Sequence, residues 1–121
     1  MVTGRPAVKA PELDLKHLER MYGFRNRQDV MRFVREHPFL LPLLLEARPA
    51  IERHFGGDAT VIIRLFADSE DAAAGPMLYA GIVTAMSASE AAERLDQLDE
   101  DWWLDHSDRA QGLLCLTVEF L

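Results

Sequence analysis

The sequence has a single cysteine, Cys115, and no long apolar segment. One cysteine excludes a disulfide within the chain. The longest apolar run, Phe39 to Leu45, has seven residues, whereas a membrane-spanning helix needs about 20. Met1 to Pro11 also lacks the apolar stretch that a secretory leader requires. We therefore expect a cytoplasmic protein that does not enter a membrane.

The familiar signatures of catalysis and cofactor binding are absent from the sequence. Its four histidines form no HxH, HxxxH or HExxH pattern, and no spacing of histidine and cysteine suits zinc. The adjacent glycines Gly56 and Gly57 lack both the GxGxxG pattern and the lysine of a phosphate-binding loop. We therefore expect no cofactor, and the sequence does not favour an enzyme.

Basic residues are scarce in the second half of the chain. Residues 1–60 carry ten Lys and Arg against eight Asp and Glu, whereas residues 61–121 carry three arginines against twelve carboxylates. The net charge of −7 disfavours nonspecific binding to nucleic acid, whose phosphates require basic side chains. A basic partner would approach the C-terminal half first.

Hydrophobic periodicity predicts a helical N-terminal part. Residues 1–10 contain few large apolar side chains, so we expect a flexible tail followed by a single domain over residues 11–121. Apolar residues at helical spacing predict helices within 11–22, 27–37 and 39–55. Asn26 is a suitable N-cap for the second of these helices.

The C-terminal part reads as strands with one helix between them. Runs rich in β-branched and apolar residues predict three strands, over 60–66, 77–84 and 113–120. Gly81 weakens the second strand or allows a close approach there. Ser87 followed by Glu90 is a capping box that begins a helix. We expect an α+β domain in which N-terminal helices precede β-β-α-β, with a small three-stranded mixed sheet and helices packed on one face.

The densest feature is the segment Asp99-Glu100-Asp101-Trp102-Trp103-Leu104-Asp105, which holds both tryptophans. Ala91, Leu95, Leu98 and Trp102 recur at spacings of four, three and four, so Trp102 should lie in the core. Adjacent helical residues point about 100° apart, which leaves two interpretations of Trp103. It packs under the following loop, or it forms an exposed aromatic anchor for a partner.

The carboxylates of this segment also allow two interpretations. Asp96, Asp99 and Glu100 lie at i, i+3 and i+4 and share one helical face. Such a face could bind a hard cation such as Mg²⁺, or it could simply be the solvated side of the helix. Arg94 and Arg109 are the nearest cations in sequence that could offset the like charges.

Two blocks of the sequence resemble a family of small uncharacterised bacterial proteins. The blocks are residues 34–47 and residues 90–105, and the second contains an Asp-Glu-x-Trp-Trp element. The resemblance covers most of residues 27–120 and implies no activity, cofactor or catalytic residue. Genes of such proteins can sit in two-gene units that resemble toxin–antitoxin pairs, which favours a protein partner.

We therefore predict a small interaction protein that binds another protein through its acidic C-terminal half, which favours a basic partner. The predicted contact residues are Asp96, Asp99, Glu100, Asp101, Trp103 and Asp105. A homodimer is a further expectation, because a small sheet leaves edges that can pair. The alternative is a divalent-metal-dependent hydrolase that uses Asp96, Asp99 and Glu100 as ligands.

Overall fold

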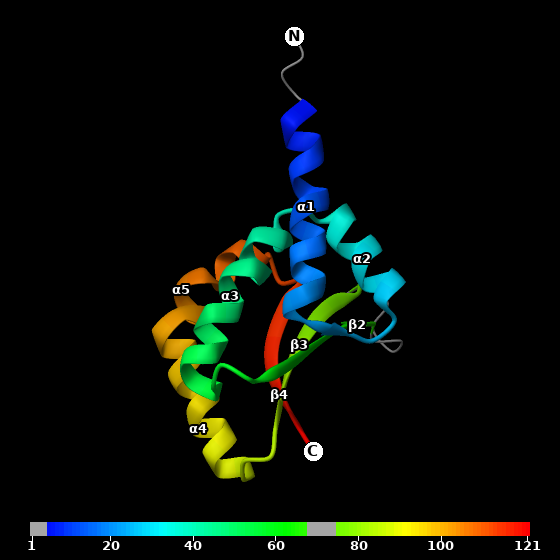
Figure 1. Cartoon of the computed structure of the whole chain (residues 1–121). Coiled ribbons are helices and arrows are strands. Elements are labelled where there is room, and N and C mark those ends of the chain that lie inside the picture. Colours follow the sequence, from blue (N-terminus) through cyan, green and yellow to red (C-terminus); the bar gives the residue numbers. More distant parts are fainter. Residues whose placement is uncertain (1–4, 68–74) are drawn as a thin grey trace.

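The computed structural model describes residues 5–67 and 75–121, which form helices and one mixed sheet (Figure 1). The helical elements are α1 Arg5–Met21, α2 Arg27–Glu36, α3 Leu40–Phe55, α4 Ala88–Leu98, the π-helical turn η1 Asp99–Trp103, α5 Leu104–His106 and the 3-10 turn η2 Ser107–Ala110. The strands are β1 Gly23–Phe24, β2 Thr60–Phe66, β3 Met77–Thr84 and β4 Leu114–Phe120. The expected α+β class is confirmed.

The sheet has four strands in the order β1-β2-β3-β4, so the prediction of three strands is wrong. Strands β2 and β3 pair as an antiparallel hairpin, and β4 lies parallel to β3 after the α4 crossover. The additional strand β1 has only two residues and pairs with β2 in parallel. It escapes a pattern search because Gly23 and Phe24 are too short a run to show alternation.

Two details at the N-terminal side differ from the sequence expectation. Helix α1 begins at Arg5 rather than at Pro11, so residues 5–10 are helical where we expected a tail. Residues 1–4 of that expected tail lie outside the described residues. Asn26 precedes α2 but makes no side-chain cap, because its backbone is left-handed, with φ of 53°. Its carbonyl oxygen instead accepts hydrogen bonds from the N–H groups of Asp29 and Val30.

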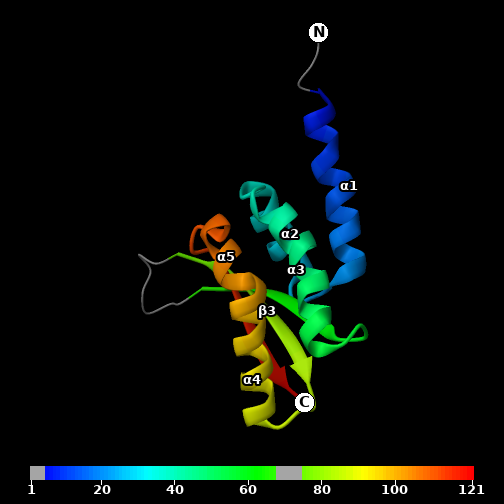
Figure 2. The same cartoon turned by 90° about the vertical axis from the view of Figure 1, so that its left-hand side faces the viewer.

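The helices form a layer in which α3 lies between α1 and the α4–α5 segment (Figures 1 and 2). The core between this layer and the sheet contains fully buried leucines of α3 together with alternate residues of β2, β3 and β4. The strand residues of this core are Val61, Ile63, Leu78, Ala80, Ile82, Leu114 and Leu116. In the described part of the chain, no helix is long and apolar enough to cross a membrane.

The opposite side of the sheet carries the remaining strand residues, and we call it the open face. Its members follow from the strand register: Gly23, Thr60, Ile62, Arg64, Phe66, Met77, Tyr79, Gly81, Val83, Cys115, Thr117 and Glu119. Across the described residues, none of these side chains belongs to the core that the helices cover. The sheet is therefore packed against helices through one side only.

Candidate functional site

The acidic and aromatic segment singled out from the sequence forms the wide turn η1, which joins α4 to α5. Helix α4 begins as expected, because Ser87 Oγ accepts a hydrogen bond from the backbone N–H of Glu90 (3.2 Å). The chain then widens from an α-helix to a π-helical turn over Asp99–Trp103. Such a turn accommodates one extra residue within a helix and often occurs at functional sites.

The wide turn brings three aromatic rings together. Trp102 lies in the core with 9% of its surface exposed, which confirms the prediction from the apolar stripe. His106 stacks on its indole at 4.5 Å between ring centroids, and Trp103 stacks at 6.0 Å. The ring nitrogen Nδ1 of His106 lies 2.7 Å from the carbonyl oxygen of Trp102. Trp103 is half-buried and packs against the core, which favours the packing interpretation of this residue.

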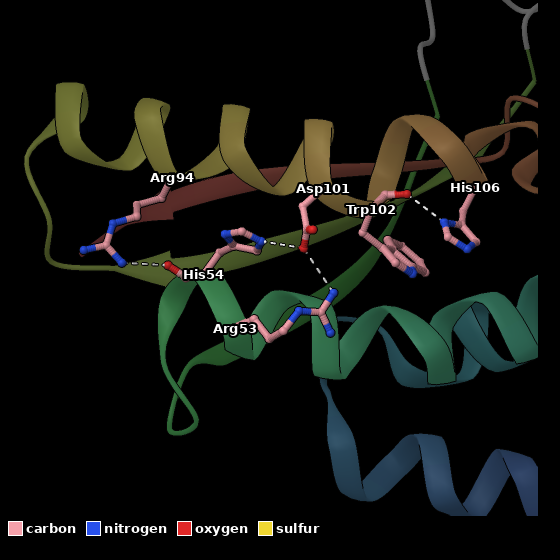
Figure 3. A network of polar contacts seen from close by, with 6 residues as sticks. All are labelled: Arg53, His54, Arg94, Asp101, Trp102 and His106. Atoms are coloured by element: carbon pink, nitrogen blue, oxygen red, sulfur yellow. Dashed lines mark hydrogen bonds and ion pairs between the residues drawn. The ribbon is translucent and has the colours of Figure 1, made fainter.

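Asp101 turns toward α3, where two basic side chains meet it (Figure 3). Its Oδ2 lies 3.0 Å from Nε2 of His54 and 3.2 Å from a guanidinium nitrogen of Arg53. Hydrogen bonds from His54 and Arg53 hold the pKa of the Asp101 carboxyl below its usual range. This carboxylate therefore joins η1 to the C-terminal end of α3.

Two arginines that we considered as counter-ions for the acidic cluster have other partners. Arg94 donates a hydrogen bond to the carbonyl oxygen of His54 at 3.0 Å, which satisfies a carbonyl in the last turn of α3 (Figure 3). Arg109 forms a bidentate pair with Glu46 of α3 at 2.7 and 2.8 Å. We call the contact between α3 and the α4–α5 segment the seam. It contains arginines from both sides, Arg53 from α3 and Arg94 and Arg109 from the other.

The outward side of the same segment carries carboxylates without cations. We call it the outer ridge, and its members are Glu93, Asp96, Glu100, Leu104, Asp105 and Asp108, all of them exposed. Among residues 5–67 and 75–121, no ion pair involves any of its five carboxylates. Leu104 is 63% exposed in the midst of these charges. The ridge is thus an acidic surface with one apolar side chain.

Asp99 differs from the ridge because it is half-buried beside Asp96. Burial, and then the neighbouring charge of Asp96, raise the pKa of the Asp99 carboxyl. Within the described ranges, no group of three or more His, Cys, Asp or Glu side chains is placed to hold a metal ion. The structure therefore does not bring Asp96, Asp99 and Glu100 together as a metal-ligand set.

A second charged cluster, on the open face, was not anticipated from the sequence. Glu119 of β4 lies across β3, over the position where Gly81 has no side chain, and a Cβ there would overlap its carboxylate. Its Oε1 accepts a hydrogen bond from Arg25 at 3.1 Å, while Nε of Arg64 lies 3.9 Å from its Oε2. The guanidinium of Arg64 also lies 4.8 Å from the ring centroid of Tyr79.

The signal for this cluster was limited to Gly81, for which we expected weakening or a close approach. The structure shows the close approach, made by the Glu119 side chain. The two arginines are far from Glu119 in sequence, so no local pattern could connect the three residues.

No family model, curated protein or solved structure matches the chain in the comparisons. The resemblance to proteins with an Asp-Glu-x-Trp-Trp element therefore stays a prediction.

Proposed function

We propose that the chain is a protein-binding module that receives a basic partner on the outer ridge. The observation that supports this is the unequal use of charge on the two sides of the α4–α5 segment. Toward α3, Asp101 and Arg109 have partners of opposite charge. Toward solvent, the five carboxylates of the ridge have no cation in the described structure. Uncompensated like charges repel one another, and a basic partner would remove that repulsion.

The proposed contact residues are those exposed on the outer ridge. Asp96, Glu100 and Asp105 are exposed on the ridge and keep the contact role assigned from the sequence. Leu104 joins them as an apolar anchor at the centre of a polar rim, an arrangement common to protein interfaces. Asp99, Asp101 and Trp103 take supporting positions in this proposal, since they are half-buried or bonded to α3.

The test is co-expression of the tagged full chain with the products of neighbouring genes. We expect one of them to co-purify and to dissociate at about 1 M salt, where charges are screened beyond about 3 Å. The double variant Asp96→Lys with Glu100→Lys should lose the partner.

The matched control reverses two exposed carboxylates elsewhere, Glu36→Lys with Asp58→Lys. It changes the net charge by the same amount and should retain the partner. If no neighbouring product co-purifies with the wild type, or if both double variants behave alike, the proposal is wrong.

A further inference from the structure

We infer that the groove between α1 and α2 binds a small organic phosphate. Its cavity measures about 260 Å³ and is lined by Leu15, Lys16 and Glu19 of α1 and by Arg27 and Arg35 of α2. That volume lies just below the usual range for pockets that bind small molecules, so it suits a ligand of few atoms. These residues are separate from the outer ridge, so the site is independent of the proposed function.

The groove carries an excess of two positive charges. Its lining holds three basic side chains against one carboxylate, that of Glu19. Glu19 bonds to Arg27. Lys16 and Arg35 form no ion pair among the described side chains. The whole chain has a net charge of −7, so this excess is a local feature. A phosphomonoester carries about −1.5 to −2 charges at pH 7 and would neutralise it.

The arginines of α2 are the expected anchors for the phosphate, because a guanidinium presents parallel N–H groups that match phosphate oxygens. Arg27, Met31 and Arg35 recur every four residues and lie along one side of this helix. A second cavity, of about 380 Å³, is lined by all three of them. Met31 there and Leu15 in the first cavity are only 2% and 5% exposed and give the groove an apolar floor. The organic part of the ligand would lie on this floor.

The probe for this site is phenyl phosphate, titrated into the ¹⁵N-labelled full chain at about pH 7.5, where the phosphate is a dianion. We expect amide chemical-shift changes confined to α1 and α2, with a dissociation constant of about 1 mM because the groove is open to water. Phenyl sulfate has a similar shape but one negative charge, and it should bind about threefold more weakly or worse. Inorganic phosphate should also bind more weakly, because it has no apolar part to lie on the floor.

Substitutions in the groove should change the affinity in both directions. Arg35→Gln and Lys16→Gln should each weaken binding about three- to tenfold. Arg20→Gln removes the same charge at an exposed position of α1 outside the two cavities, and it should have little effect. Glu19→Gln should tighten binding, because it removes the carboxylate that occupies Arg27. Circular dichroism of each variant verifies that it is folded.

Four results would overturn the inference. The first is the absence of shift changes in α1 and α2 at about 10 mM phenyl phosphate, well above the expected dissociation constant. The second is equal affinity for phenyl sulfate, and the third is equal affinity for inorganic phosphate. The fourth is unchanged binding by folded Arg35→Gln and Lys16→Gln chains. Each of these failures leaves the proposed function untouched, because capture of a basic partner depends on the outer ridge.

Discussion

Asp101 and Glu119 occupy similar electrostatic settings in two different regions. Each carboxylate has two basic side chains beside it, Arg53 and His54 for the first and Arg25 and Arg64 for the second. Their solvation differs, because the Asp101 side chain is 48% exposed and the Glu119 side chain 20%. Asp101 joins two helices at the surface, whereas Glu119 lies on the sheet with one oxygen that has no hydrogen-bond donor among the described residues.

The number of acidic residues nearby in the sequence is therefore a poor guide to which carboxylate is buried and short of hydrogen-bond donors. Asp101 belongs to the densest acidic stretch of the sequence, and it is solvated and well partnered. Glu119 is the sole charged residue of β4, and it is the more buried and the less satisfied of the two. The burial of each group is set by its surroundings in three dimensions, and so is the free-energy cost of leaving it unpaired.

The largest effect should come from removing Trp102, which anchors the turn that carries Asp101. Trp102→Ala deletes a buried aromatic side chain and should lower the free energy of unfolding by about 3–5 kcal/mol. Trp103→Ala removes a half-buried ring and should cost about 1–2 kcal/mol. Urea denaturation of both variants measures the difference. Equal losses of unfolding free energy would contradict this prediction, which rests on the greater burial of Trp102.

The next effect concerns the glycine beneath Glu119. Gly81→Ala places a methyl group where the Glu119 side chain lies, so that side chain must move and give up Arg25. We expect a loss of about 1–2 kcal/mol in the free energy of unfolding. In a Glu119→Ala background the same substitution should be neutral or stabilising, because alanine restricts the unfolded chain. A double-mutant cycle with no coupling between the two positions would contradict the close approach.

A smaller effect is the pH dependence that Asp101 contributes. Its pKa in the folded state lies below the ordinary value of 3.8, so its stabilisation is present above that pH. The stabilisation is lost as the pH falls through the folded-state pKa. Asp101→Asn should therefore lose less stability than the wild type between about pH 6 and pH 3.

Thermal unfolding at several pH values measures this effect, and Glu100→Gln is the matched control on the outer ridge. That control breaks no ion pair of the described structure and removes a like-charge repulsion, so its stability should not fall less than that of the wild type as the pH is lowered. If the Glu100→Gln curve coincides with that of Asp101→Asn, the hydrogen bonds from Arg53 and His54 to Asp101 are not the cause of the pH dependence.

The smallest effect is expected from divalent ions. Because the described residues bring no set of metal ligands together, Mg²⁺ should raise Tm no more than NaCl of equal ionic strength. Differential scanning fluorimetry of the wild type and Asp99→Ala checks this. A Mg²⁺-specific increase in Tm that Asp99→Ala abolishes would restore the metal-dependent hydrolase as the better proposal.

Much of the fold was predictable because its signals are local. The β-branched and apolar runs in 60–66 and 77–84 predicted β2 and β3, and the Ser87 cap placed the start of α4. Trp102 followed from an apolar stripe that the structure places in the core. Strand β1 was missed because its two residues are held by pairing with β2, and pairing between distant segments has no local pattern.

The site was less predictable for the same reason. The sequence located the acidic segment but could not separate its seam side from its solvent side, since Arg53 and His54 lie more than 45 residues from Asp101. The Glu119 cluster depends on side chains from three strands or their flanks, and only the strand register brings them together.

The wide turn η1 also sets the rotational phase of everything that follows it. In an uninterrupted α-helix, the position seven residues after buried Leu98 would face inward, and that position is Asp105. The extra residue shifts the phase by about 100°, so His106 packs on Trp102 and Asp105 faces solvent. Closing the wide turn to a regular α-helix without deleting a residue would turn the Asp105 carboxylate toward the core. The acidity of the outer surface beyond this turn thus depends on one inserted residue as much as on composition.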